Sequence, residues 1–244
     1  MTKAAEPEFE SFQGEPDHYD EAYYNGNGQA GDRPALRWYV RMVRRYLGPG
    51  PYLDFGCGTG HLLRRLAAHG SASGFEISDY SAGLSRRTAP GSPVYTALDD
   101  IPGGVFRGLT AIHVLEHLDD DTSHEVLDCW RRVLWPHGRA LVVMPDPAGR
   151  ARAMAGERWT GFQDPTHINL KPHAEWRAFL RAAGFTVLRE GSDGLWNVPY
   201  TRLPKLIDAG RYAVPALSQF LAGRLFLPPG SGESSVFVLQ RIGS

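Results

Sequence analysis

Short apolar runs alternate along this chain with segments whose apolar residues recur at helical spacing. The runs that read as buried strands are Tyr52 to Phe55, Ala72 to Phe75, Pro93 to Ala97, Leu109 to Val114, Ala140 to Met144, Phe185 to Leu188 and Ser235 to Gln240. Apolar residues at helical spacing predict helices over the segments that contain Leu36, Leu62, Val126 and Trp176. Strands and helices that alternate in this order predict an α/β fold with a doubly wound sheet.

Local signals mark the ends of some of these elements. Thr122 to Glu125 has the form of a capping box, which predicts that a helix begins there. Trp130 lies on the apolar stripe of that helix, so we expect it in the core rather than in a substrate site. Arg37, Arg41, Arg44 and Arg45 lie largely off the stripe of the first helix and predict a solvated basic face, with anion binding as the lesser alternative.

Two long stretches depart from regular pattern. Residues 145–170 are broken by proline and glycine and bring Trp159, Asp164 and His167 close together in sequence, and irregular segments of this length are often functional. Residues 195–230 form a proline-rich, partly helical insertion before the last strand, predicted to be a substrate cap or else a dimer surface. The predicted organisation is an N-terminal segment or lid (1–31), a core domain (32–194 and 231–244) and the inserted cap (195–230).

The composition of the chain excludes several classes of protein. A chain of 244 residues with 42% apolar content can bury the core of one domain. The formal net charge of −1 gives no general reason to bind nucleic acid or an anionic membrane. Two cysteines provide neither a disulfide framework nor a four-cysteine zinc site, and no apolar run is long enough to span a membrane. We therefore expect a cytoplasmic protein with no nucleic-acid or membrane partner.

A glycine-rich turn follows the first predicted strand. Gly56, Gly58 and Gly60 lie between that strand and the next helix, where residues without a Cβ permit positive φ and let a ligand approach the backbone. Glu76 ends the second strand, 20 residues beyond Gly56, where a carboxylate can accept both ribose hydroxyls. The loop and the acid together predict a nucleoside pocket.

The segment Asp54-x-Gly-x-Gly-x-Gly60 resembles the class I S-adenosylmethionine-dependent methyltransferases. Later segments resemble the family in the same order: Phe106 to Leu118, Leu134 to Pro145 and Arg181 to Val187. The resemblance implies a Rossmann-like, mostly parallel sheet with an antiparallel last strand, and S-adenosylmethionine as the cofactor. The cofactor contacts that it implies are Asp54, Gly56, Cys57, Gly58, Gly60, Glu76, Leu98, Asp99 and His113. Arg107 departs from the family, which usually has aspartate after the phenylalanine.

Two histidines are the candidates for acid–base chemistry. A hydroxyl acceptor must lose a proton during methylation, and histidine titrates in the useful range. We expect His167 to be the general base and His117 to orient it or the substrate; the alternative is that both histidines only form hydrogen bonds with the backbone around the loop. The expected acceptor is a small molecule, most simply a hydroxyl of a sugar, nucleoside or phenolic or other specialised metabolite. The candidate acceptor contacts are Tyr23, Trp159, Asp164, Trp196 and Tyr200.

Several other interpretations compete with this one. His113-x-x-Glu-His117 is similar to a segment with which some methyltransferases bind a divalent metal, so Glu116, His117 and His167 are the ligands if a metal is used. Nitrogen or carbon acceptors, an NAD-dependent oxidoreductase, a non-catalytic cofactor-binding module and a homodimer remain alternatives. Asn197-Val-Pro-Tyr200 is similar to a base-flipping motif but follows the sixth strand instead of the fourth, which argues against nucleic acid.

Overall fold

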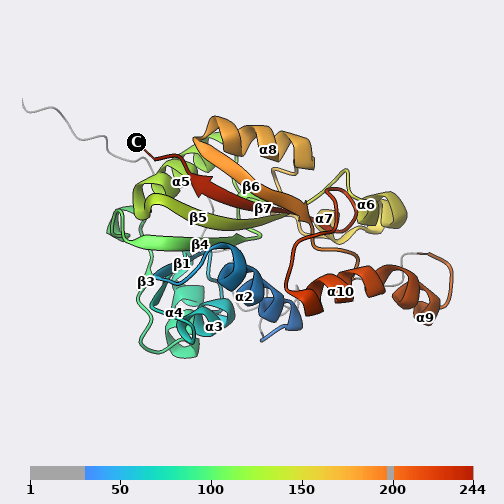
Figure 1. The fold of residues 1–244 in the computed structure, drawn as a ribbon, viewed down its shortest axis with the longest axis horizontal. Helices are drawn as coiled ribbons and strands as arrows, with labels where there is room; N and C mark the ends of the chain where they lie inside the picture. The colour runs from blue at the N-terminus through green and yellow to red at the C-terminus, as the bar shows by residue number, and fades with distance from the viewer. Residues whose placement is uncertain (1–30, 197–200, 244) are drawn as a thin grey trace, which may run out of the picture.

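Seven strands form a single sheet in the order β3-β2-β1-β4-β5-β7-β6 (Figure 1). This computed structural model describes residues 31–196 and 201–243. The first five strands of that order pair in parallel, and β7 pairs antiparallel with both β5 and β6. The predicted Rossmann-like, doubly wound sheet with an antiparallel last strand is therefore confirmed. The strand order reverses between β1 and β4, and ligands bind open sheets of this kind at the carboxyl ends of the strands beside such a reversal.

The strands lie close to the predicted apolar runs. Their bounds are β1 Tyr52–Phe55, β2 Ala72–Phe75, β3 Val94–Tyr95, β4 Phe106–Ile112, β5 Leu134–Pro145, β6 Phe185–Ser192 and β7 Ser234–Arg241. β1 and β2 have the predicted bounds because glycine or a charged residue follows each run. β3 is shorter than predicted, and β5 begins six residues earlier, where Leu134 pairs with Phe106 on β4.

Helices connect the strands and cover both faces of the sheet. Their bounds are α2 Pro34–Tyr46, α3 His61–Ala67, α4 Asp79–Thr88, α5 Asp120–Val133, α6 Arg150–Ala155, α7 Thr160–Gln163, α8 His173–Ala182, α9 Lys205–Asp208 and α10 Val214–Ala222. Short 3-10 turns lie at Leu98–Asp100, Leu115–His117 and Gly156–Arg158, and a π-helical turn at Ala209–Ala213 joins α9 to α10. α4 was not predicted from the apolar pattern.

The core consists of two apolar layers, one on each side of the sheet. α5 and α8 cover one face, where Trp130 and Trp176 are fully buried. α2 and α3 cover the other face, where Met42 and Leu63 are fully buried (Figure 1). Trp130 packs edge-on against Phe55, with ring centroids 5.6 Å apart, so its predicted place in the core is confirmed.

Two local predictions were wrong. α5 begins at Asp120, and its N-cap is Asp119, whose Oδ1 accepts a hydrogen bond from the backbone N of Thr122 at 2.8 Å. Thr122 therefore lies in the first turn and does not cap the helix. Residues 145–170 are less irregular than predicted, because α6 and α7 form there around the buried Trp159.

The insertion before β7 is partly helical, as predicted. α10 packs beside α2 through two arginines: Arg41 donates to the carbonyl of Phe220 and Arg45 to that of Gly223, each at 2.8 Å. In Figure 1 α9 and α10 extend from one end of the molecule, away from the sheet. Whether this segment acts as a separate cap over the substrate stays a prediction.

Candidate functional site

The glycine loop connects β1 to α3 and lies against the end of β2. The backbone N–H groups of Gly56 and Cys57 both donate to the carbonyl of Phe75, at 2.8 and 2.9 Å. Gly56, Gly58 and Gly60 have φ values of 72°, 51° and 82°, in the left-handed region that favours glycine. The loop is therefore a rigid turn at the carboxyl edge of the sheet.

Two of these glycines are also required by close packing within the protein. A Cβ on Gly56 would lie 2.6 Å from Cγ2 of Val114, and a Cβ on Gly60 would lie 2.6 Å from Oγ of Ser85. The space that we expected to admit a ligand is thus filled at these two positions by the protein's own side chains. The contact at Gly56 places the segment that follows β4 directly against the glycine loop.

Glu76 binds the glycine loop with both of its carboxylate oxygens. Its Oε2 accepts from the backbone N of Gly58 at 2.8 Å, and its Oε1 accepts from that of Ser78 at 3.1 Å. The side chain is buried, and burial raises the pKa of this carboxyl although the backbone hydrogen bonds lower it. Each oxygen retains a second lone pair, so Glu76 can still accept two hydroxyl donors.

Asp54 is buried at the end of β1 and has one carboxylate oxygen without a partner. Its Oδ1 accepts from Oγ1 of Thr110 at 2.6 Å, whereas its Oδ2 has no hydrogen-bond partner among the described residues. Burial raises the pKa of this carboxyl to about 7, despite the hydrogen bond from Thr110. A buried acceptor without a partner is costly and suits a donor supplied by a ligand.

The remaining predicted cofactor contacts lie around this edge. Cys57 is buried, and its Sγ lies 3.3 Å from Oγ of Ser85, so its side chain packs inside the protein. Leu98 and Asp99 begin the 3-10 turn after β3; Leu98 packs partly against the core and Asp99 is exposed. Their role beside an adenine ring stays a prediction.

The turn after β4 carries a strained histidine and a buried glutamate. His113 has a φ of 58°, which is unusual for a residue other than glycine and is typical of functional sites. Its Nδ1 lies 2.8 Å from Oε1 of Glu116, a side chain that is 0% exposed. Burial alone would raise the pKa of Glu116, but that pKa is lowered overall, chiefly by the hydrogen bond from His113. The Oε2 of Glu116 has no hydrogen-bond partner among the described residues.

His117 is held by a hydrogen-bonded chain that begins at Asp164. The hydroxyl of Thr166 donates to Oδ1 of Asp164 at 2.5 Å, so its oxygen is left to accept from His117 Nδ1 at 2.8 Å. This arrangement assigns the proton of His117 to Nδ1 and makes Nε2 the acceptor nitrogen. Burial lowers the pKa of His117, although Glu116 opposes the shift, so the ring is neutral near pH 7.

His167 is fixed in the same tautomer by a backbone carbonyl. Its Nδ1 lies 2.8 Å from the carbonyl oxygen of Gly161, which can only accept, so Nδ1 carries the proton. Its Nε2 lies 3.9 Å from Oδ2 of Asp164, and its ring centroid lies 4.8 Å from that of His117. Nitrogen or oxygen atoms of Glu116, His117 and His167 all lie within 4.8 Å of one another.

The loop that carries His167 is tied to the end of β4 by Asn169. Its side-chain amide donates to the carbonyl of Leu118 at 2.8 Å, and its backbone N donates to the carbonyl of Glu116 at 3.0 Å. Sequence reasoning placed Thr166 and Asn169 in the same candidate loop as His167 but did not predict that they hold the two histidines in place. The only signal in the sequence was that these residues lie within a few positions of His167.

Another buried carboxylate, which was not predicted from the sequence, follows the end of β6. Oδ1 of Asp193 accepts from the backbone N of Ser234 at 2.8 Å and from that of Glu233 at 3.2 Å. Burial, together with the nearby Glu233 carboxylate, raises the pKa of Asp193 to about 7. These bonds join the ends of β6 and β7 near the start of the insertion.

The predicted acceptor contacts fall into different environments. Trp159 is buried in a small apolar cluster with Ala151 and Leu195. Trp196 is 41% exposed, and its Nε1 donates to the carbonyl of Asp193 at 3.2 Å. Tyr23 and Tyr200 lie outside the described residues. Contact of any of these side chains with an acceptor stays a prediction.

Comparison with known proteins identifies the fold and the family. Residues 29–190 match the family model described as a methyltransferase domain. No curated protein matches the chain in sequence. Within the described residues, no helix is both long and apolar enough to cross a bilayer.

Solved structures share this fold at low sequence identity. A S-adenosylmethionine-dependent methyltransferase from Archaeoglobus fulgidus is 17% identical, with a TM-score of 0.60 over 91% of this chain and 100% of that one. A Thermotoga maritima methyltransferase described as a possible histamine N-methyltransferase is 17% identical, with a TM-score of 0.64 over 92% and 98%. The 1,6-didemethyltoxoflavin-N1-methyltransferase of Burkholderia thailandensis is 16% identical, with a TM-score of 0.59 over 93% and 87%.

Proposed function

The chain belongs to the class I S-adenosylmethionine-dependent methyltransferases, and from this premise we propose that it methylates a hydroxyl of a small molecule with His167 as the general base. The observation that carries the proposal is the pair of histidines whose Nδ1 protons are fixed by Thr166 and Gly161. Val114, three residues before His117, packs against Gly56 of the glycine loop, and ligands bind sheets of this kind at the carboxyl ends of the strands.

The residues around the glycine loop suit the cofactor that the family uses. When bound, S-adenosylmethionine supplies a methyl group that is already electrophilic because it is carried by a sulfonium. Glu76 would hold the ribose hydroxyls with its remaining lone pairs, and the unpartnered Oδ2 of Asp54 would accept from the amino group of the methionine end. Leu98 and Asp99 would lie beside the adenine. His113 would line the same cofactor pocket.

The protein's task in the transfer is to place the acceptor and to remove its proton. Alignment of the acceptor with the methyl group in a dry pocket carries most of the rate. His167 Nε2 would take the proton of the hydroxyl, a step worth about 10²–10⁴-fold when the base is well placed. The neighbouring Asp164 carboxylate, 3.9 Å away, stabilises the imidazolium that results. His117 would position the acceptor.

Activity and cofactor affinity measured separately test this role for His167. A panel of sugars, nucleosides and phenols is screened with methyl-labelled cofactor, and His167→Ala is compared with the parent protein and with His69→Ala, an exposed histidine. We expect turnover to fall by about 10²–10⁴-fold in His167→Ala while affinity for S-adenosylhomocysteine is unchanged. Undiminished turnover in His167→Ala would reject the proposal.

A second candidate is metal-assisted transfer at the same side chains. The buried and unpartnered Oε2 of Glu116 and two imidazoles with fixed tautomers form a donor set that suits several divalent cations. The two roles exclude each other, because a nitrogen that binds a metal cannot take a proton. Calorimetry with Mn²⁺, on the parent protein and on Glu116→Gln, measures the site without any acceptor. Activity that survives chelation, together with no heat of Mn²⁺ binding, would remove this candidate.

Methylation of nitrogen is the main alternative for the acceptor atom. The Burkholderia thailandensis enzyme on this fold is an N1-methyltransferase solved with its small-molecule substrate, which supports a small-molecule acceptor and leaves the atom open. An amine that is neutral at the working pH needs no base. A product labelled on nitrogen, with turnover insensitive to His167→Ala, would therefore replace O-methylation with N-methylation.

A further inference from the structure

The insertion exposes an unusual amount of apolar surface. We define the α9–α10 face as the exposed apolar side chains of this segment, which are Leu203, Leu206, Ile207, Val214, Leu217, Leu221 and Phe226. Leu206 is 87% exposed and Leu221 is 66% exposed. Val214, Leu217 and Leu221 recur at i, i+3 and i+7 and so lie along one side of α10. Clustered apolar side chains of this kind mark a surface that binds something.

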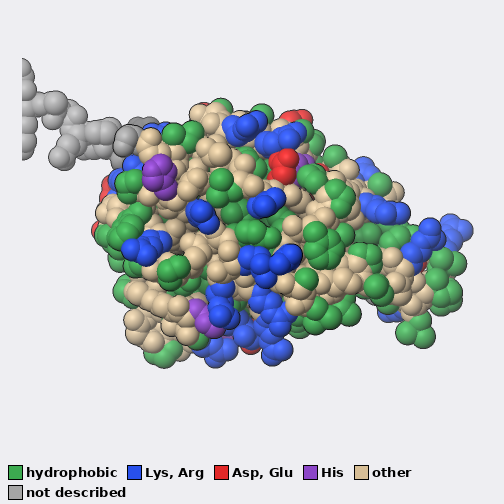
Figure 2. Space-filling view, in the orientation of Figure 1, with side chains coloured by type: hydrophobic (Ala, Val, Ile, Leu, Met, Phe, Trp, Pro, Cys, Tyr) green, Lys and Arg blue, Asp and Glu red, His purple; other side chains and the backbone are tan. Residues whose placement is uncertain are grey.

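Every exposed charge within this segment is positive. The exposed basic residues are Arg202, Lys205, Arg211 and Arg224. Between residues 201 and 227 the only acid is Asp208, which is fully buried. None of the four exposed cations forms an ion pair with a described residue. Figure 2 shows blue and green side chains together at this end of the molecule, with no red among them.

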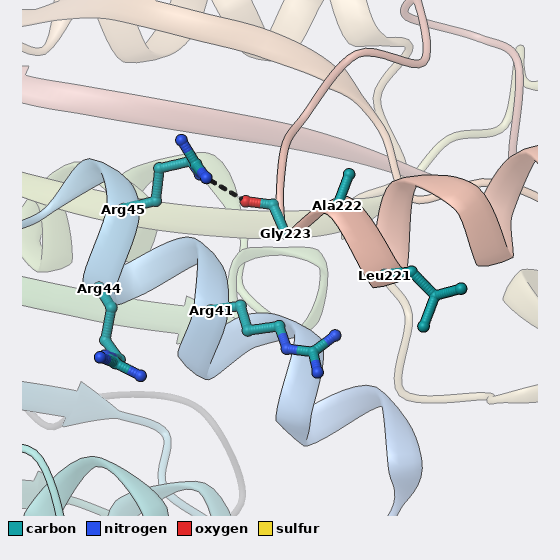
Figure 3. A pocket seen from close by; sticks show the side chains of 6 residues that line it. All are labelled: Arg41, Arg44, Arg45, Leu221, Ala222 and Gly223. Carbon is teal, nitrogen blue, oxygen red and sulfur yellow. Dashed lines mark hydrogen bonds between the residues drawn. The ribbon is translucent and has the colours of Figure 1, made fainter.

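α2 extends the positive charge beside α10. Arg41, Arg44 and Arg45 line a shallow hollow of about 500 Å³ together with Leu221 and the end of α10 (Figure 3). Arg41 and Arg45 donate to carbonyl groups at that end, which satisfies one hydrogen bond of each guanidinium and leaves its charge uncompensated. Arg44 has no carboxylate partner among the described residues. The hollow thus combines guanidinium groups with an apolar side chain.

We propose that the α9–α10 face and the adjoining arginines dock on the surface of an anionic phospholipid bilayer. Apolar side chains interspersed with lysine and arginine, without acids, are typical of helices that lie in a membrane interface without spanning it. A second copy of this chain is a poor partner, because a two-fold contact would bring the same cations together.

The overall net charge concealed this surface. A formal charge of −1 predicted no attraction to an anionic membrane, but seven of the 27 acids and only one of the 26 basic residues lie within residues 1–30. The rest of the chain therefore carries an excess of positive charge. Its placement on α2 and the insertion is a property of the fold.

Vesicle co-sedimentation with the full chain tests the proposal. We expect binding to vesicles that contain phosphatidylglycerol, little binding to phosphatidylcholine alone, and release at high salt because exposed charges are screened. The double variant Leu206→Ser/Leu221→Ser should bind about tenfold more weakly or worse, since each leucine loses its burial in the interface. Arg44→Ala/Arg211→Ala should lower binding only to the anionic vesicles.

Matched control variants test whether binding depends on the α9–α10 face. Light scattering tests whether a second copy of this chain covers that face instead of a membrane. Ile242→Ser and Arg189→Ala change an exposed aliphatic residue and an exposed cation outside the α9–α10 face and should bind as the parent does. Equal weak binding to both kinds of vesicle, or full binding by the leucine double variant, would overturn the proposal. So would a dimer in solution that the leucine double variant converts to a monomer, because a second copy would then cover the face.

Discussion

Replacing Glu76 with glutamine changes the hydrogen bonding of one side chain at nearly constant volume. In the parent protein both carboxylate oxygens accept from the backbone, one from Gly58 at 2.8 Å and one from Ser78 at 3.1 Å. Glutamine has a single acceptor oxygen, so its amide NH₂ must face one of these N–H donors. One buried N–H group is then left without a partner, and one of the two oxygens that could accept from a ribose hydroxyl is replaced by NH₂.

The expected costs follow from those two hydrogen bonds. A buried N–H without a partner costs about 1–3 kcal/mol of unfolding free energy. A domain of this size loses about 2–4 °C in Tm for each kcal/mol. A hydrogen bond from a ribose hydroxyl to a carboxylate is worth about 1.5–3 kcal/mol, so loss of one should weaken binding of S-adenosylhomocysteine by about 10-fold to 100-fold. Affinity should therefore fall while the protein remains folded.

Calorimetry with S-adenosylhomocysteine and thermal unfolding measure the two effects separately. Glu125→Gln on the exposed side of α5 is the matched control and should change neither quantity. If Glu76→Gln bound the ligand as tightly as the parent and unfolded at the same temperature, Glu76 would hold neither the loop nor the ribose. A fall in stability alone would leave Glu76 a purely structural residue.

Two further predictions concern the same edge of the sheet. Gly60→Ala should lower the unfolding free energy by about 2 kcal/mol or more, as measured by urea titration. A φ of 82° is strained for alanine, and its Cβ would lie 2.6 Å from Oγ of Ser85. An unchanged urea midpoint would contradict this packing. Burial raises the pKa of Asp54 to about 7 from its ordinary value of 3.8. The folded state therefore binds more protons than the unfolded state between those values, and stability falls as pH rises through that window. Asp54→Asn should flatten this fall, and an identical pH profile in parent and variant would show that the carboxyl is ionised.

The sheet was predictable because its signals are local. β1 and β2 are short apolar runs, and β1 ends at the glycine turn whose φ values only that residue type adopts without strain. The predicted start of α5 was wrong because two residues that favour the N-cap position lie close together in the sequence. Asp119 and Thr122 are both good capping residues, and the apolar stripe of α5 does not show which of them begins the first turn.

The sequence by itself determined the order of strands and helices, the glycine loop and the acid after β2. Each of these features depends only on a short stretch of consecutive residues. The tertiary structure alone decided that Thr166 would fix the tautomer of His117, 49 positions away, and that His167 would lie against Glu116. It also brought the arginines of α2 beside the end of α10, about 180 residues away, around one hollow. Periodicity reports only which face of an element is apolar, whereas hydrogen-bond partners and charge neighbours depend on how distant segments meet at the edge of the sheet.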